Sequence, residues 1–221
     1  MVYLKLIGIV LAKEKIKEND ANVYILTKKD GIMKIYAKGL FQSKSKNLSL
    51  METGNWLQLY LFSENEKLHL ISSLPLKTKY LFFEKYPLIY LSVFKLIKKL
   101  EIIETPEFLW QVLEKLDFYI RQNPENFFHW FIYHFLTSLG YEPEIEKCFK
   151  CNKKLQKNIF FDNKLFLYCS QCKKDAYLKI KEDDFKKALK IKDEKRVPKS
   201  LPKFLKIILK NFLIKTKTVL K

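Results

Sequence analysis

The segment Asn22-Val-Tyr-Ile-Leu-Thr27, Lys28-Lys-Asp-Gly31, Ile32-Met-Lys-Ile-Tyr-Ala-Lys38 decides the fold class of the first third of the chain. Two runs rich in aliphatic and aromatic residues flank the dipeptide Asp30-Gly31. Glycine tolerates the positive φ that a tight hairpin turn demands. The segment therefore predicts two antiparallel strands, at residues 22–27 and 32–38, joined by a turn.

Further strands are expected on both sides of this hairpin. Residues 2–11 form a long apolar run, residues 56–62 alternate leucines with other side chains, and residues 67–72 follow a polar turn. Five strands without an intervening helix leave exposed edges unless the sheet closes, and the five-stranded OB-fold barrel closes it. We expect an α+β fold with an N-terminal OB-fold domain over residues 1–76.

Helical periodicity begins after Leu74-Pro75, and residues 77–221 are expected to form an α-helical domain. Residues 88–104 carry apolar side chains on one face, and Asn123-Pro124 supplies a helix cap followed by proline at the first helical position. Residues 127–139 are dense in aromatic side chains. A base-stacking platform is conceivable there, but a helix that is apolar on most sides is typical of a core helix, which is our interpretation.

All four cysteines lie in two pairs, Cys148-Phe-Lys-Cys151 and Cys169-Ser-Gln-Cys172, separated by 17 residues. This is the spacing of a tetrathiolate zinc site. A redox motif usually has one pair, and two disulfides need an oxidising compartment that the rest of the chain does not indicate. We predict one structural Zn²⁺, because four thiolates leave no open position for catalysis. The zinc-ribbon-like module, residues 148–172, is inserted in the helical domain and is expected to clamp the C-terminal third against the helices.

The net charge of +18 is unevenly distributed. Residues 1–80 carry 13 lysines against 7 acids, residues 81–147 carry 7 basic against 10 acidic groups, and residues 148–221 carry 22 against 7. Two basic ends attract polyanions, with nucleic acid first and anionic membrane second. Since Arg121 and Arg196 are the only arginines, we expect phosphate contacts with little sequence specificity.

The C-terminal residues 201–212 predict a basic amphipathic helix. Such a helix can lie on a membrane, but it more often docks its apolar face on its own domain, and we interpret it as docked. No uninterrupted apolar run reaches membrane-spanning length, and residues 6–12 lack the features of a signal peptide. We expect a cytoplasmic, nucleoid-associated protein without membrane contact.

No pattern in the sequence supports an enzyme. The chain has no Walker A, G-x-G-x-x-G, HExxH or G-x-S-x-G motif, and its five glycines are too few for phosphate-cradling loops. The residues alone leave two main alternatives, a nucleic-acid-binding protein and a non-enzymatic zinc-ribbon adaptor that binds acidic protein partners.

An ordered set of short motifs is similar to one known family. The motifs are Gly8-Ile-Val-Leu11, Glu18-Asn-Asp20, Leu26-Thr27 with Gly31, Ala37-Lys-Gly39, Lys44-Ser-Lys46, and Leu139-Gly-Tyr-Glu-Pro-Glu144 before the first cysteine pair. Over nearly the whole chain to about Cys172, the sequence resembles the bacterial recombination and repair mediator family RecO. One departure is Asn152, because the family commonly has glycine directly after the first pair.

The resemblance implies a non-enzymatic mediator of DNA repair and homologous recombination. Such proteins bind single- and double-stranded DNA, anneal complementary strands and help load the RecA recombinase onto single-stranded DNA. The partners implied are RecR and the single-stranded-DNA-binding protein, whose acidic C-terminal tail is recognised.

The residues that contact DNA are our own prediction and do not come from the resemblance. Lysines on the barrel offer a groove that tracks the phosphate backbone, and aromatic side chains beside them can stack on bases. The candidates are Lys34, Tyr36, Lys38, Phe41, Lys44 and Lys46. The basic C-terminal third is expected to supply a second DNA surface.

Overall fold

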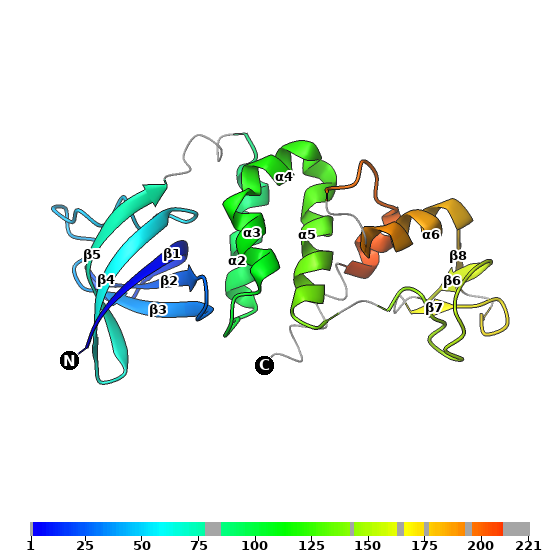
Figure 1. Ribbon diagram of the computed structural model, residues 1–221, viewed down its shortest axis with the longest axis horizontal. Helices are drawn as coiled ribbons and strands as arrows, with labels where there is room; N and C mark the ends of the chain where they lie inside the picture. Colours follow the sequence, from blue (N-terminus) through cyan, green and yellow to red (C-terminus); the bar gives the residue numbers. More distant parts are fainter. Residues whose placement is uncertain are drawn as a thin grey trace. The chain divides into compact units, whose positions relative to one another are not determined.

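The computed structural model describes residues 2–77, 85–141, 144–162, 166–174, 177–192 and 196–209 (Figure 1). The chain divides into two compact units, Met1–Trp110 and Gln111–Lys221. The predicted domain boundary at residue 76 lies at the end of the strands, while the first unit continues through one complete helix and into the next.

The first unit contains a closed five-stranded barrel with the strand order β1-β2-β3-β5-β4. Neighbouring strands are antiparallel except β3 and β5, which pair in parallel over two residues. The strands are β1 (Val2–Lys15), β2 (Ala21–Thr27), β3 (Ile32–Ala37), β4 (Trp56–Glu64) and β5 (Lys67–Lys77). The predicted OB-fold barrel is confirmed.

Two strands are longer than the sequence predicted. β1 continues to Lys15 because its first half pairs with β4 and its second half with β2. β5 continues through Leu74-Pro75, which the periodicity had marked as the end of the strands. The predicted alternation on β4 is confirmed, since Leu57, Leu59 and Leu61 are fully buried in the barrel core.

Helix α2 (Pro87–Lys99) packs on β1, and the segment that follows it returns to the β2–β3 turn. The amide of Ile32 donates to the carbonyl of Ile102 at 2.9 Å, and the Thr105 hydroxyl donates to the Thr27 carbonyl at 2.6 Å. The predicted helix 88–104 is therefore too long, because residues 102–105 are used to hold the barrel turn.

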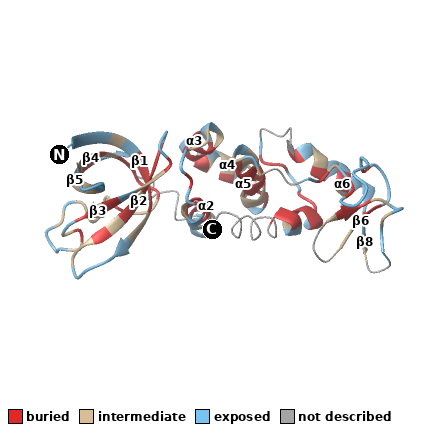
Figure 2. Ribbon diagram, turned by 90° about the horizontal axis from the view of Figure 1, so that it is seen from below, coloured by how far each residue is buried: buried red, intermediate tan, exposed pale blue. Residues whose placement is uncertain are grey.

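The second unit begins within α3 (Glu107–Glu114) and continues through α4 (Leu116–Gln122) and α5 (Pro124–Ser138). Asn123 caps α5, since its side-chain oxygen accepts from the amide of Asn126 at 3.2 Å. Gly140 follows with φ +84°, the left-handed conformation in which many helices end. Most aromatic side chains of α5 are buried, which confirms the interpretation as a core helix (Figure 2).

A small three-stranded sheet with the order β7-β6-β8 follows in the chain. Its strands are β6 (Ile159–Phe161), β7 (Leu167–Tyr168) and β8 (Leu178–Ile180). The hairpin β6–β7 lies between the two cysteine pairs, and in it Asp162 accepts from the amide of Phe166 at 2.9 Å. β8 was not predicted, and it extends the sheet beyond Cys172.

The C-terminal part comprises α6 (Glu182–Leu189), the 3-10 helix η1 (Lys190–Lys192) and helical residues 203–209. Leu205 and Leu209 are fully buried, which confirms the docking of the predicted amphipathic helix; its residues 210–212 lie outside the described part. The side-chain amides of Asn123 and Asn126 donate to the Lys199 carbonyl at 2.9 and 3.1 Å. The C-terminal third is thus tied to α5 directly, and the cysteine module is not its only attachment.

Candidate metal centre and basic surface

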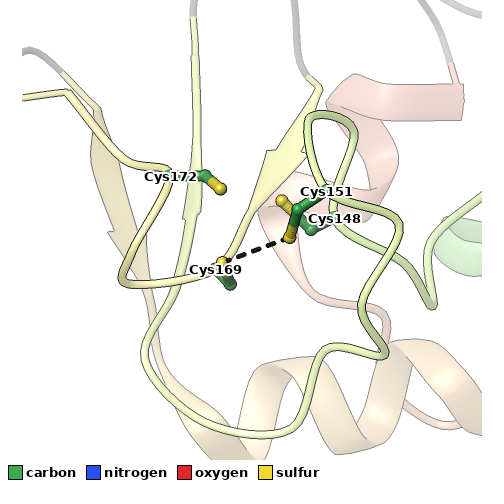
Figure 3. A group of neighbouring side chains, drawn as sticks. All are labelled: Cys148, Cys151, Cys169 and Cys172. Carbon is green, nitrogen blue, oxygen red and sulfur yellow. Dashed lines mark hydrogen bonds between the residues drawn. The ribbon is translucent and has the colours of Figure 1, made fainter.

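Two tight turns bring all four thiols together (Figure 3). In the first turn, the amide of Asn152 donates to the Cys148 carbonyl at 2.9 Å, and in the second, the amide of Cys172 donates to the Cys169 carbonyl at 3.1 Å. The strand β7 ends immediately before Cys169, so the β6–β7 hairpin carries the second turn to the first. The predicted convergence of the two pairs is therefore present.

The distances between the thiols fit one tetrahedral ion. All four sulfurs lie within 4.8 Å of one another, and Cys151 Sγ is 3.8 Å from Cys169 Sγ. A metal–sulfur bond of about 2.3 Å places two sulfurs of a tetrahedron about 3.8 Å apart. All four cysteines are free thiols, so none is withdrawn into a disulfide. The four thiols can hold a metal ion.

The thiols of Cys148 and Cys172 differ in acidity. Burial raises the pKa of the Cys148 thiol, but hydrogen bonds from the backbone at Cys169 and Cys151 outweigh burial and lower the pKa to about 6. Burial and hydrogen bonds with the other thiols raise the pKa of Cys172 to about 12. The Cys148 thiol therefore ionises readily, whereas the raised pKa of Cys172 means that a bound cation would be needed to ionise that thiol near neutral pH.

Asn152 closes the first turn with φ +57°, in the left-handed region. Glycine adopts this region without strain and asparagine tolerates it, whereas a β-branched residue does not. Asn152→Val is expected to destabilise the module by about 1–2 kcal/mol, and Asn152→Gly is expected to be tolerated. Chemical denaturation, monitored by the release of zinc, measures the stability of both Asn152 variants. Lys153→Val is the control at the neighbouring exposed position. An equal effect of both valine variants would contradict this explanation.

Three of the candidate lysines lie on the connection between β3 and β4. Lys38, Lys44 and Lys46 are exposed there, and a hydrogen bond of 2.9 Å from the Phe41 amide to the Asn19 carbonyl anchors this connection. The structure thus brings these lysines to one connection of the barrel, and their contact with DNA stays a prediction.

Lys34 lies elsewhere, on β3, in a pocket of about 320 Å³ that it shares with Glu14, Lys98 and Glu101. Hydrogen bonds from Lys98 and Tyr24 lower the pKa of the Glu14 carboxyl, and the charge of Lys34 lowers it further. Because two carboxylates line this pocket, Lys34 is a weaker candidate for a phosphate contact than the three lysines of the connection.

The two candidate aromatic residues also have structural contacts. The Tyr36 hydroxyl donates to Asp20, whose other oxygen accepts from the Gly39 amide at 2.8 Å. The Gly39 amide and the Tyr36 hydroxyl lower the pKa of the Asp20 carboxyl. Phe41 is half-buried against the barrel core, and Lys15 Nζ lies 5.7 Å from its ring centre. Both rings are therefore held in place rather than freely mobile.

Tyr36 belongs to a row of rings that the sequence analysis missed. His69 on β5 is the register partner of both Tyr36 and Phe62. The Tyr36 and His69 rings meet edge to face at 5.3 Å, and the Phe62 and His69 rings stack at 4.6 Å. The signal in the sequence was the alternation along residues 56–62, but only the register of the closed barrel shows which rings become neighbours.

Comparison with known protein families covers both units. The family model described as "Recombination protein O N terminal" matches residues 1–80, and the model described as "Recombination protein O C terminal" matches residues 107–181. The chain belongs to the recombination protein O (RecO) family. The N-terminal RecO match contains every strand of the barrel, and the C-terminal RecO match contains all four cysteines and ends just after β8.

A curated relative carries the same family name. The chain is 26% identical over 155 residues to a DNA repair protein RecO from Prosthecochloris aestuarii (strain DSM 271 / SK 413). The similarity covers 64% of this chain and 56% of the relative, so the chain spans little more than half the length of that RecO protein.

Parts of the RecO resemblance fall outside the described residues, namely Glu142 and Pro143 of the motif before the first cysteine pair. Among the described residues, no helix combines the length and the apolar composition needed to cross a membrane.

Proposed function

We propose that this chain acts in DNA repair and homologous recombination by binding single- and double-stranded DNA without strong sequence preference and annealing complementary strands. Annealing requires that the repulsion between two polyanions be screened before bases pair. A protein with two basic surfaces supplies that screening if each surface neutralises one strand. The proposal extends to helping RecA load onto single strands, together with RecR and the single-stranded-DNA-binding protein.

The observation that carries the proposal is the combination of a RecO-type OB barrel with the exposed lysines Lys38, Lys44 and Lys46 on one connection. OB-folds bind single strands through a basic groove lined by aromatic rings. The sequence from 148 to 221, with 22 basic and 7 acidic groups, supplies a second basic surface. Lysine contacts to phosphate explain binding without base recognition.

The proposal includes one structural Zn²⁺ held by Cys148, Cys151, Cys169 and Cys172. Soft thiolates in tetrahedral geometry favour zinc, and a site closed by four protein ligands has no position left for substrate. The ion would therefore stabilise the β6–β7 hairpin and its two turns without taking part in a reaction.

Changing Lys38, Lys44 and Lys46 together to glutamate is expected to slow annealing at least about 10-fold. Each lysine that contacts phosphate contributes about one to the slope of log affinity against log salt concentration, so the slope should fall by about three. Anisotropy titrations over a range of salt concentrations measure the slope, and a stopped-flow assay measures annealing.

The matched control is the triple variant Lys95→Glu, Lys99→Glu, Lys115→Glu, which makes the same change of charge at exposed positions of α2 and of the turn between α3 and α4. It should alter the slope much less than the barrel variant. An equal loss in both variants would show that only the total charge matters, and unchanged annealing by the barrel variant would remove the barrel from the DNA site.

The mediator role is tested by annealing of complementary strands coated with the single-stranded-DNA-binding protein, with and without this chain. Faster annealing in its presence is the expected result. Binding of an acidic peptide combined with no DNA affinity at moderate salt would favour the adaptor function instead.

A further inference from the structure

Phe149 lies between the two cysteines of the first pair, and its side chain is 57% exposed. Its amide donates to the Leu167 carbonyl at 2.8 Å, which joins this turn to β7. Its ring stacks on Phe166 with centroids 3.9 Å apart and planes inclined by 19°. The ring is therefore fixed in orientation, while the part that Phe166 does not cover stays open to solvent.

The segment of the chain that contains this ring is strongly basic. Residues 147–181 contain ten lysines and two aspartates, and every lysine among them that the structure describes is exposed. One of the aspartates, Asp162, accepts hydrogen bonds from the Phe166 amide and the Tyr168 hydroxyl at 2.9 and 3.1 Å, so it is used within the hairpin. Lys150 follows Phe149 directly and is exposed.

A fixed ring open to solvent amid lysines matches the chemistry of a single nucleic-acid strand. The lysines contact phosphates, and an unpaired base stacks on the ring irrespective of its identity. A duplex cannot offer the same contact, since its bases are already stacked and paired within the helix. An acidic peptide would also satisfy the lysines, but it would leave the flat ring surface without a planar partner.

We propose that Phe149, supported by Phe166, is a base-stacking contact for single-stranded DNA, and that the cysteine module thereby prefers single strands to duplexes. This inference rests on the proposed DNA-binding function and deepens it, because it assigns the type of strand to the basic C-terminal surface. Phe149 was not among the DNA contacts expected from the sequence.

The test compares Phe149→Ala with Phe118→Ala in the full-length, zinc-loaded chain. Phe118 is also 57% exposed, but it lies on α4 beside Asp117 and away from a lysine cluster in sequence. The probes are an oligothymidylate of about 16 nucleotides, at the upper end of OB-fold site sizes, and a hairpin duplex of the same charge. Zinc stoichiometry of each variant verifies that the module is intact.

Phe149→Ala is expected to weaken oligothymidylate binding about 10-fold, as for the loss of one stacked base, and duplex binding less than about 2-fold. Because stacking releases no counterions, the salt slope should stay unchanged. Phe149→Tyr, which keeps the ring, should retain the affinity, and Phe118→Ala should bind both probes like the unchanged protein.

Equal losses on both probes, or unchanged binding of oligothymidylate, would overturn the inference. So would a Phe149→Ala variant that loses affinity only for an acidic peptide, since the surface would then be a peptide site. Absence of DNA binding by the unchanged protein is a different result, because it would remove the proposed function itself.

Discussion

Replacing Cys148 and Cys151 together by serine is expected to abolish metal binding and to unfold the three-stranded sheet of residues 159–180, while the barrel stays folded. Few hydrogen bonds between strands stabilise the sheet, since its strands are three, two and three residues long. Sheets this small are marginal in water without further support. The metal would supply that support by joining the two turns.

The free energy of zinc binding is large enough to make the effect of the double serine variant severe. Structural zinc contributes an apparent binding free energy of about 10–16 kcal/mol in zinc-finger peptides, which is comparable with the whole stability of a domain, about 5–15 kcal/mol. Loss of two of four thiolates therefore removes more free energy than the hydrogen bonds of a short hairpin can replace. We expect local unfolding, because the contacts of Asn123 and Asn126 with Lys199 do not involve the cysteines.

Hydrogen exchange measured by mass spectrometry, combined with zinc quantification, distinguishes these outcomes. Protection should be lost in peptides from residues 144–180 and retained in β2, β3 and α5. Lys150→Ser is the control, because it alters the same turn and leaves the four thiols in place. If zinc is lost from the double variant while protection and the thermal midpoint stay unchanged, the scaffold role is wrong.

The convergence of the four cysteines could be predicted because the spacing that produces it is local. Two residues between thiols define each turn, and the hairpin between the pairs needs only a turn near Asp162. β8 could not be predicted in the same way, since Leu178 and Lys179 are exposed and carry no alternation of buried and exposed residues. Its strand character comes from pairing with β6, which is a tertiary effect.

For the candidate DNA contacts, the sequence predicts the secondary structure but not the neighbouring side chains. The sequence predicts that Lys34 and Tyr36 lie on a strand, and β3 confirms it, but it cannot show what faces them. The carboxylates beside Lys34 come from β1 and from the segment after α2, and the ring beside Tyr36 comes from β5. Residues brought together by barrel closure are separated along the chain, so their local sequence carries no sign of the contact.

Gly31 shows both a local feature that the sequence predicts and a tertiary contact that it does not. The Asp30-Gly31 pair predicts a turn with positive φ, and φ at Gly31 is +61°. The sequence did not show that the chain returns there after α2. A Cβ atom at Gly31 would lie 2.2 Å from the Ile102 carbonyl oxygen and 2.4 Å from the Ile103 carbonyl carbon, both backbone atoms. Only glycine satisfies both conditions.

Gly31→Ala is expected to destabilise the first unit by about 2–4 kcal/mol. Left-handed strain contributes about 1–2 kcal/mol, and displacement of residues 102–103 weakens the hydrogen bond from Ile32 to Ile102, worth about 0.5–1.5 kcal/mol. The contact with the backbone adds further strain, because a carbonyl cannot rotate away as the end of a side chain can. Denaturant unfolding monitored by the fluorescence of Trp56 and Trp110 measures the change, since these rings meet edge to face in the same unit.

Gly140→Ala separates the two causes within the same chain. Gly140 also has a positive φ, +84°, but a Cβ atom there would meet nothing within 4 Å. Its replacement should therefore cost only the left-handed strain, about 1–2 kcal/mol. The difference between the two variants then isolates the close approach of residues 102–103 to the β2–β3 turn. Equal destabilisation would mean that the segment after α2 yields without cost, and that it does not hold the barrel turn as the hydrogen bonds indicate.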